Sequence, residues 1–173
     1  MVRAGKDGAA PGESVAMTSP EPVEGMAGDQ RLRGLVGYSL KRAYYRFQSD
    51  AARVLEGFGL RISTYSALVV ICDNTDLRQS QLAQILSVER SNTVVVVDAL
   101  EQAGLIARHR VPKDRRSYAL RPTRAGRQLC DRASAALDQH EDRILTDIDP
   151  AERAELLRLL QRMEAAAVSR EDP

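Results

Sequence analysis

Hydrophobic residues recur at every third or fourth position over most of this chain, which is the spacing of amphipathic helices. In the first such stretch an apolar stripe lies opposite a face of tyrosines and basic residues. Because Gly57 and Gly59 lie at its end, we predict one long helix over residues 32–58. Residues 1–28 are rich in Gly, Ala, Pro, Ser and Glu and lack the pattern, so we predict a disordered tail there.

Three shorter helices are predicted next, over residues 63–72, 80–86 and 90–103. Ser63 is the expected N-cap of the first of them. A turn-forming Asn-Thr-Asp sequence separates the first from the second. Gly104 follows the third at the position where a glycine commonly ends a helix.

The third of these helices contains four consecutive valines, residues 94–97, which favour a strand by intrinsic propensity. A valine costs only ~0.5–0.7 kcal/mol relative to alanine in a helix. The residues after the valines continue as a helix, and Val97 and Leu100 fall on one face of it. We therefore predict a helix here.

Two short strands and two further helices complete the pattern. The strands are predicted over residues 105–111 and 117–120, joined by a charged hairpin loop at 112–116. Thr123 is the expected N-cap of the next helix, and Asp149, followed by Pro and Ala and then Glu, begins the last. The predicted fold is mainly α with a small β-hairpin.

The net charge of the chain is only +1, but its basic residues are unevenly distributed. Residues 104–127 contain eight basic side chains and a single acidic one, Asp114. The basic residues are Arg108, Arg110, Lys113, Arg115, Arg116, Arg121, Arg124 and Arg127. A concentrated basic segment in a nearly neutral chain is typical of nucleic-acid-binding proteins, and a solvated charged surface is the alternative interpretation.

Other classes of protein are disfavoured. No apolar run approaches the ~18 residues of a membrane span and no secretory signal begins the chain, so we expect a cytoplasmic protein without membrane association. Cys72 and Cys130 are interpreted as buried thiols, with redox sensing as the alternative. With only two histidines, His109 and His140, a dedicated zinc site is not expected. Because no phosphate-binding loop and no Cys/His or Ser/His pairing indicates an enzyme, no catalytic residue, metal or cofactor is predicted.

Four short motifs carry a resemblance to a known family. Residues 81–88 read QLAQILSV, residues 100–106 read LEQAGLI, residues 114–120 read DRRSYAL, and residues 123–126 read TRAG. They resemble the LA..L.V, LE..GL, D-x-R and T..G motifs of the MarR family of winged helix-turn-helix transcriptional regulators, at the family's spacing. The resemblance covers about residues 32–166.

The resemblance implies a winged helix-turn-helix domain at residues 63–122 and a helical dimerisation region at residues 29–62 and 123–168. The apolar stripes of the first and last helices have no place in the small winged domain, so we expect a second copy of the chain to cover them. The buried contacts of the homodimer are expected to include Leu156, Leu159, Leu160 and Met163. Pro122 stands where the family has an aliphatic residue, and because proline lacks a backbone donor we expect the second strand to end early.

The resemblance also makes the helix over residues 90–103 the recognition helix, whose N-terminal end enters the major groove of double-stranded DNA. Arginine can pair with guanine, asparagine with adenine, and a methyl-bearing side chain can contact thymine. The expected base-reading residues are Arg90, Ser91, Asn92, Thr93 and Val96. Ser91 and Asn92 have the alternative role of capping the helix.

The charged hairpin is the wing that the resemblance implies. Arg115 is expected in a minor groove, and Asp114 is expected to pair with Arg116 and hold the wing in shape. Contacts to DNA phosphates are expected from Arg110, Lys113, Arg116 and Arg124. A twofold dimer places its recognition helices about 34 Å apart, so the expected DNA site is an inverted repeat.

Members of the family often respond to a small aromatic acid, a phenol or an acyl-CoA thioester. Aromatic rings interleaved with guanidinium groups suit such an anion, and the first helix carries both. The candidate effector-binding residues are Tyr38, Arg42, Tyr45, Arg46, Arg61, Tyr65 and His109. A solvated face with amphipathic tyrosines is the alternative. No cysteine lies in the first helix, so the peroxide-sensing chemistry of some members is not expected here.

We therefore predict a dimeric, sequence-specific DNA-binding regulator, a repressor released by a small ligand. The competing hypothesis is a winged-helix module that associates with other proteins and does not read DNA. Salt-sensitive DNA binding distinguishes the two, because contacts to phosphates release counterions.

Overall fold

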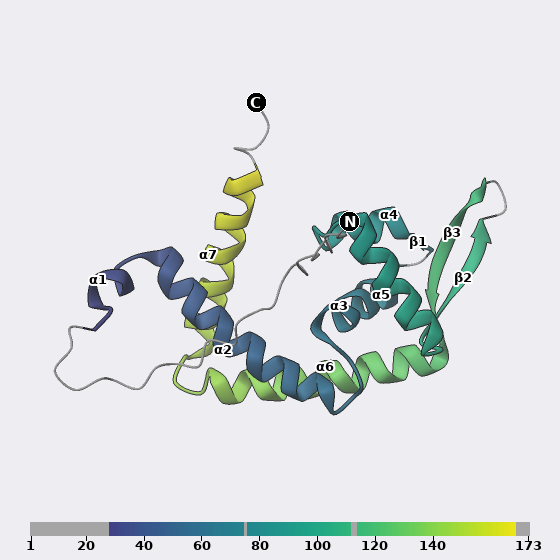
Figure 1. Cartoon of the computed structure of the whole chain (residues 1–173). Coiled ribbons are helices and arrows are strands. Elements are labelled where there is room, and N and C mark those ends of the chain that lie inside the picture. The colour runs from purple at the N-terminus through teal and green to yellow at the C-terminus, as the bar shows by residue number, and fades with distance from the viewer. Residues whose placement is uncertain (1–27, 75, 112–113, 169–173) are drawn as a thin grey trace, which may run out of the picture. The chain divides into compact units, whose positions relative to one another are not determined.

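The computed structural model describes residues 28–74, 76–111 and 114–168, and for residues 111, 114–117, 167 and 168 it describes the backbone alone. The elements in these ranges are α1 (Gln30–Arg33), α2 (Val36–Glu56), α3 (Ile62–Asp73), β1 (Leu77–Arg78), α4 (Gln79–Ile85), α5 (Arg90–Gln102), β2 (Ile106–Val111), β3 (Asp114–Pro122), α6 (Arg124–Ile144) and α7 (Pro150–Val168) (Figure 1). The predicted fold class, mainly α with a small β-hairpin, is confirmed. The chain divides into two compact units, residues 1–46 and 47–173.

The first predicted helix is in fact two helices. α1 ends at Arg33 and α2 begins at Val36, and between them the backbone N–H of Leu35 donates to the carbonyl of Leu32 at 2.9 Å. The turn was not predicted because the three- and four-residue spacing of apolar residues continues through it. A single long helix and two helices joined by a short turn therefore give the same hydrophobic pattern. The turn brings Asp29 beside α2. The predicted disordered tail falls mainly on residues 1–27, which lie outside the described residues.

α3 begins one residue before its predicted N-cap. Ser63 lies inside the first turn, and the cap position belongs to Arg61. The backbone N–H of Arg61 donates to the hydroxyl of Thr64 at 2.9 Å. The prediction for Ser63 was wrong because the hydroxyl that accepts a backbone N–H at the start of α3 belongs to Thr64, inside the first turn of the helix.

β3 is the central strand of a three-stranded antiparallel sheet with the order β1-β3-β2. Leu77 of β1 pairs with Leu120 of β3, and Ile106 of β2 pairs with Pro122. The expectation that Pro122 would end the strand early was wrong, because the proline occupies the last position of β3, where one missing donor interrupts no further pairing. β1 was not predicted, since two residues show no alternation.

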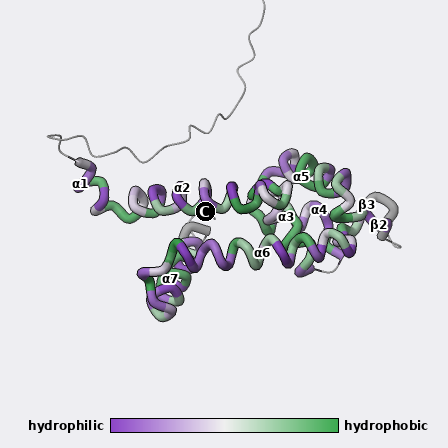
Figure 2. The backbone as a smooth tube through the Cα atoms, turned by 90° about the horizontal axis from the view of Figure 1, so that it is seen from below, coloured by the Kyte–Doolittle hydropathy of each residue, from purple (hydrophilic) through white to green (hydrophobic). Residues whose placement is uncertain are grey.

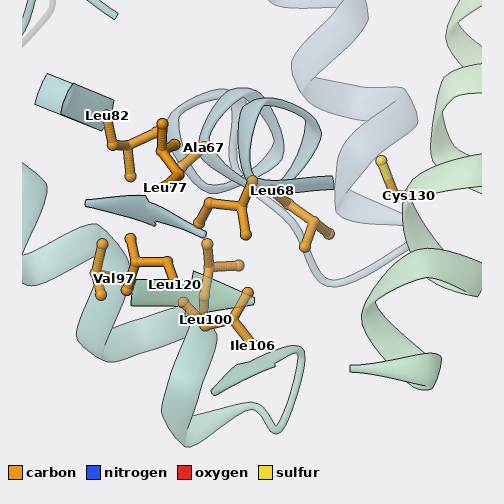
Figure 3. Packing of buried hydrophobic residues seen from close by; sticks show 10 residues of the cluster. Ala67, Leu68, Leu77, Leu82, Val97, Leu100, Ile106, Leu120 and Cys130 are labelled. Carbon is orange, nitrogen blue, oxygen red and sulfur yellow. The ribbon is translucent and has the colours of Figure 1, made fainter. Parts of the chain in front are cut away.

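The main core lies where α3, α4, α5 and the sheet meet. Figure 3 shows Val97 and Leu100 of α5 beside Leu120 and Ile106 of the sheet. The buried members of this cluster are Ala67, Leu68, Ile71, Leu77, Leu82, Val97, Leu100, Ile106, Leu120 and Cys130. Burial of these side chains fixes which face of α5 points inward and leaves the other face to solvent. A second cluster of Leu55, Leu60 and Ala133 joins the end of α2 to α6.

The turn between α4 and α5 sets the start of α5. Ser87 has a left-handed φ of +51°. Its N–H donates to the carbonyl of Gln84 at 3.2 Å, and the N–H of Val88 donates to the carbonyl of Ala83 at 3.0 Å. These two hydrogen bonds end α4 and fix the direction in which the chain enters α5. Gly104, with φ +68°, ends α5 by the same device.

Both predicted caps of the C-terminal helices are confirmed. Thr123 Oγ1 accepts the backbone N–H of Gly126 at 3.0 Å and begins α6. Asp149 Oδ1 accepts the backbone N–H of Glu152 at 3.0 Å and that of Ala151 at 2.7 Å, and the Glu152 side chain accepts the N–H of Asp149 at 3.0 Å. These reciprocal bonds form the capping box that the sequence predicts for α7.

Outside the helix-turn-helix and the hairpin, two groups of large apolar side chains are exposed in the single chain. In α1, α2 and the turn between them these are Leu32, Leu35, Val36, Leu40 and Tyr44. In α7 they are Leu156, Leu157, Leu159 and Met163. Figure 2 shows hydrophobic and hydrophilic residues alternating along α6 and α7, whereas hydrophobic residues gather over α3 and α5. The predicted dimer contacts on α7 are thus available to a partner, with Leu160 half-buried.

Candidate functional site

The N-terminal end of α5 presents polar side chains to solvent. Arg90, Ser91 and Asn92 are all exposed, as the proposed recognition residues must be. The hydroxyl of Ser91 donates to the carboxylate of Glu89 at 3.4 Å, and α5 has no side-chain cap from its N-cap residue, Glu89. In the structure, therefore, Ser91 and Asn92 lie within the helix instead of at its cap position.

Thr93 must be removed from the predicted base-reading residues. Its exposed fraction is only 2 %, and its hydroxyl donates to the carbonyl of Glu89 at 3.1 Å. Thr93, Val97 and Leu100 are spaced by four and three positions and all face the core. The side chain therefore faces away from any DNA that lies against the exposed face of α5.

The exposed valines of α5 are residues that the sequence analysis missed. Val95 is 69 % exposed and Val94 is 43 % exposed, whereas the predicted Val96 is partly buried against the core. The signal was present in the sequence, because the phase of a helix that buries Thr93 and Val97 turns Val94 and Val95 outward. Val95 is consequently the better candidate for contact with a thymine methyl group.

The predicted wing residues are described only in part. β2 and β3 form the hairpin, with an irregularity in register between Arg110 and Val111. Arg110 and Arg124 are exposed. β3 begins at Asp114, so the backbone of Asp114, Arg115 and Arg116 lies in the strand and not in the predicted loop. Lys113 lies outside the described residues, as do the side chains of Asp114, Arg115 and Arg116.

Two arginines of the basic segment are neutralised by acidic side chains. The guanidinium of Arg108 forms ion pairs with Asp98 and Glu101 of α5, which raise the pKa of Arg108. That of Arg121 pairs with Asp76, and the hydrogen bond lowers the pKa of the Asp76 carboxyl. The count of eight basic residues therefore overstates the positive charge offered to a nucleic acid.

Two predicted effector residues, Tyr38 and Arg42, meet around one carboxylate. The hydroxyl of Tyr38 donates to Asp29 Oδ2 at 2.7 Å, and Arg42 Nη1 donates to the same oxygen at 3.2 Å. Arg33 Nε donates to Asp29 Oδ1 at 2.6 Å. The hydrogen bonds from Tyr38 and Arg33 lower the pKa of the Asp29 carboxyl to about 2. Asp29 and Arg33 were not predicted, because α1 was not separated from α2.

The other predicted effector residues have different surroundings. The ring of Tyr45 lies 6.1 Å from the ring of Tyr44, between centroids, and Lys41 Nζ lies 5.8 Å from its centroid. Tyr65 packs against the second cluster, and its hydroxyl shares a hydrogen bond of 2.9 Å with the hydroxyl of Ser134. The remaining residues, Arg46, Arg61 and His109, are exposed. Arg61 is the N-cap of α3, and His109 lies on β2 opposite Ala119.

A shallow hollow of about 330 Å³ lies between the second half of α2 and α6. Its lining consists of Asp50, Arg53, Val54 and His140, which does not overlap the predicted effector residues. Asp50 and Arg53 form an ion pair. His140, on α6, is half-buried.

The two cysteines lie together between α3 and α6. Cys130 is buried, Cys72 is half-buried, and both belong to or pack against the main core. Burial raises the pKa of both thiols, that of Cys72 to about 12. The interpretation as buried thiols fits this environment.

Within the described ranges, no three or more His, Cys, Asp and Glu side chains are grouped so that they can hold a metal ion. Of the helices in those same ranges, none has the length and apolar character needed to cross a bilayer.

The chain is similar to known transcriptional regulators. The model of the MarR family matches residues 60–118, which include α3, α4, α5 and much of the hairpin. A protein of Thauera aromatica named for transcriptional regulation of the hcr operon is 35 % identical over 133 residues, 76 % of this chain and 80 % of that protein.

Two solved structures extend the similarity to the whole fold. The transcriptional repressor CouR bound to a 23-mer DNA duplex has a TM-score of 0.76 and 34 % identity, and the match covers 80 % of this chain and 99 % of that one. CouR from Rhodococcus jostii RHA1 bound to p-coumaroyl-CoA has a TM-score of 0.68 and 30 % identity, over 74 % and 90 % of the two chains. The match of the family model to the helix-turn-helix, and the similarity to these regulators over 76 % and 80 % of this chain, show that the chain belongs to the MarR family of winged helix-turn-helix transcriptional regulators.

Proposed function

We propose that the protein is a homodimeric, cytoplasmic repressor that binds an inverted-repeat site in double-stranded DNA and leaves it when an effector binds. The observation that carries this proposal is the N-terminal end of α5, which exposes Arg90, Ser91 and Asn92 while the opposite face of the helix is buried. Helix-turn-helix proteins insert this end of their second helix into the major groove. The similarity to CouR, which has been solved on a DNA duplex, supports the same use of α5 here.

Each exposed residue of α5 has a role suited to its chemistry. The fork of Arg90 pairs with a guanine, Asn92 pairs with an adenine, and Val95 contacts a thymine methyl group. Arg110 and Arg124 contact phosphates, which contributes affinity but little sequence preference. In the wing, Lys113 also contacts phosphate, Arg115 enters the minor groove, and Arg116 pairs with Asp114.

The dimer follows from the apolar residues that the single chain leaves exposed. Each large aliphatic side chain gains roughly 1.5–3 kcal/mol when it is fully removed from water. The exposed side chains of α7, Leu156, Leu157, Leu159 and Met163, therefore favour association with a second copy. Two copies related by a twofold axis present two recognition helices, and an inverted repeat matches that symmetry.

The effector class proposed is an aromatic acid or its CoA thioester. Tyr38 and Arg42 already hold a carboxylate in the structure, so these donors are suited to an anion. The similarity to CouR bound to p-coumaroyl-CoA favours the thioester. Release of DNA follows when the effector binds more tightly to a form of the dimer whose recognition helices no longer match the DNA site.

The test is fluorescence anisotropy with a labelled duplex that carries the DNA upstream of the protein's own gene. We expect tight binding whose logarithm falls linearly with the logarithm of salt concentration, with a slope near −0.9 per phosphate contact. Addition of p-coumaroyl-CoA, or of another aromatic thioester or acid from a panel, is expected to release the duplex. Binding that is absent, or insensitive to salt, would favour the protein-association module instead.

A matched pair of arginine variants tests the use of α5. Arg90→Ala is expected to lower specific affinity by about 1–3 kcal/mol and to relax the preference at one base pair. Arg132→Ala removes another exposed arginine, on α6, and is expected to leave that preference unchanged. Equal effects of the two substitutions on specific binding would exclude the proposed role of Arg90.

A further inference from the structure

The segment from Asp29 to Arg46 is strongly cationic. It contains five basic residues, and Asp29 is its single acidic residue. The basic residues are Arg31, Arg33, Lys41, Arg42 and Arg46. A segment with this composition attracts anions, and the one carboxylate within it is the nearest available partner.

The Asp29 carboxylate is held at both of its oxygens. Arg33 donates to Oδ1 at 2.6 Å, while Tyr38 and Arg42 donate to Oδ2 at 2.7 and 3.2 Å. Arg42 Nη1 also lies within hydrogen-bond distance of the Tyr38 hydroxyl, at 3.4 Å, and its guanidinium carbon is 5.9 Å from the centre of the Tyr38 ring. Two cations and a phenol thus converge on one oxyanion.

Asp29 does not need these bonds in order to begin α1. It occupies the N-cap position, but its side chain makes no hydrogen bond to the backbone of the helix, and its carbonyl accepts the N–H of Arg33 at 3.0 Å. Its carboxylate instead accepts hydrogen bonds from side chains of α1 and α2. The side chains of Asp29 and Arg42 remain 27 % and 32 % exposed, so solutes can reach the pair from solvent.

Arg33, Tyr38 and Arg42 can donate to an oxyanion of the protein or to an oxyanion of a ligand. A carboxylate or phosphate oxygen accepts from a guanidinium and a phenol in the same geometry, and charge-assisted bonds of this kind are the strong ones in proteins. If Asp29 were withdrawn, Arg33 and Arg42 would face each other without a counter-charge. An anion from a ligand can therefore take the place that the Asp29 carboxylate occupies in the structure.

We propose that Arg33, Tyr38 and Arg42 form the oxyanion site of the effector, and that Asp29 fills this site in the ligand-free protein and is displaced when the effector binds. This inference rests on the proposed function, because it names the groups that receive the effector. Asp29 acts as an internal competitor, so the apparent affinity for the effector is reduced by the fraction of time that Asp29 spends in the site. Its displacement breaks the hydrogen bonds by which Asp29 links the start of α1 to Tyr38 and Arg42 of α2.

The experiment is isothermal titration calorimetry of the full chain with four probes: inorganic phosphate, CoA, p-coumarate and p-coumaroyl-CoA. Asp29→Asn keeps the shape of the side chain but removes the competing charge. We expect it to bind the probes about three- to tenfold more tightly than the native chain, as suits a partly exposed ion pair. Tighter binding of phosphate and CoA identifies phosphate as the natural oxyanion, and tighter binding of p-coumarate identifies a carboxylate.

Two further variants make the result specific. Asp142→Asn removes an exposed carboxylate that pairs with Arg153 at 2.6 Å in the other unit of the chain, and it should leave every affinity unchanged. In the double variant Asp29→Asn with Tyr38→Phe, the gain in affinity for the probes should disappear, because one of the three donors is lost. Arg42→Gln, which leaves Asp29 in place, should weaken binding of the same probes about three- to tenfold.

The outcomes separate this inference from the proposed function. Unchanged or weaker affinity of Asp29→Asn for all four probes overturns the inference, even if native protein binds DNA and is released by a thioester. Tighter binding of phosphate or CoA by Asp29→Asn supports it, even if no thioester releases DNA. If Asp29→Asn does not fold, as judged by circular dichroism, unchanged binding by Arg42→Gln overturns the inference by itself.

Discussion

Arg108 of β2 and Glu101 of α5 are joined at two points. The backbone N–H of Arg108 donates to Glu101 Oε1 at 3.3 Å, and its guanidinium donates to the other carboxylate oxygen of Glu101. The same guanidinium also pairs with Asp98, one turn earlier on α5. With only 25 % of its side chain exposed, Arg108 connects the wing to the recognition helix and is not placed as a phosphate contact.

This arrangement predicts that removing negative charge from α5 weakens DNA binding. If Arg108 positions α5 against the wing, then Asp98→Asn and Glu101→Gln should each lower specific affinity, about three- to tenfold for a partly exposed pair. Simple electrostatics predicts the opposite sign, because a lost carboxylate no longer repels phosphates. Anisotropy with the specific duplex and with a random duplex measures both effects.

The control for this prediction is Asp138→Asn, which removes an exposed carboxylate from α6. It should leave the ratio of specific to random binding unchanged. An increase of specific affinity in Asp98→Asn and Glu101→Gln would mean that the ion pairs do not position α5. The salt slope gives a second check, since a positioning residue leaves the number of phosphate contacts nearly unchanged.

Substitutions of Thr93 and Val95, two positions apart on α5, are predicted to have opposite effects: the first lowers stability, and the second weakens DNA binding. Thr93→Ala empties a buried position and removes a hydroxyl bonded to the Glu89 carbonyl, so it should lower the free energy of unfolding by roughly 1 kcal/mol. Val95→Ala shortens an exposed side chain and should leave stability within about 0.5 kcal/mol. Urea denaturation measures both changes.

The same two variants should rank in the opposite order for DNA. Val95→Ala should weaken binding at a site containing the contacted thymine and lose this effect when uracil, which lacks the methyl group, replaces that thymine. Thr93→Ala should show no such dependence on the methyl group. A methyl-dependent loss in Thr93→Ala, but not in Val95→Ala, would reverse the assignment of these residues.

Local patterns predicted much of the fold because they encode contacts between neighbours in sequence. The helical identity of α5 followed from the spacing of its inward residues despite four valines. The start of α7 followed from a capping box whose bonds span three residues, from Asp149 to Glu152. The burial of Thr93 was not predicted, although it follows from the helical phase that Val97 and Leu100 define.

Interactions between distant residues were beyond that reasoning. Arg121 pairs with Asp76, 45 positions earlier, so a count of basic residues along the chain could not reveal that its charge is neutralised. Tyr38 and Arg42 were found by their helical spacing, but Asp29 reaches them only because the chain turns between α1 and α2. Burial of one side of α5 was predictable, whereas the exact partners of charged side chains required the tertiary structure.

The cysteines are predicted to react slowly with thiol reagents in the folded protein. Burial raises the pKa of Cys72 from its ordinary value of 9.0 to about 12, which lowers its thiolate fraction at pH 8 by about a thousandfold. The thiolate is the reactive form, so alkylation by iodoacetamide should be slow in native buffer and should accelerate as the pH rises toward 12. Mass spectrometry of the alkylated chain over time measures the rate.

Unfolding provides the control for this measurement. In urea both thiols should regain ordinary pKa values, and alkylation at pH 8 should become faster by a factor on the order of a hundred or more. Fast alkylation of Cys72 in the folded protein would contradict the burial and would revive the redox-sensing interpretation. A Cys130→Ser variant assigns the signal to Cys72 alone.

Gly126, in the first turn of α6, is predicted to tolerate no side chain. A Cβ atom at this position would overlap the backbone carbonyl of Leu105, which also accepts the N–H of Thr123 at 2.9 Å. Backbone cannot move aside as a flexible side chain can, so Gly126→Ala should lower the free energy of unfolding by about 1–3 kcal/mol despite the better helix propensity of alanine.

Gly37 offers the matched control because it lies inside α2 and an added Cβ there meets no atom within 4 Å beyond its chain neighbours and the backbone of its own helix. Gly37→Ala makes the same chemical change and should hold stability constant or raise it by up to ~1 kcal/mol. Both variants should be unfolded in urea at one protein concentration, since the stability of a dimer depends on concentration. If Gly126→Ala proved as stable as Gly37→Ala, the close approach of α6 to Leu105 would not exist in solution, and with it the attachment of α6 to the winged domain would be in error.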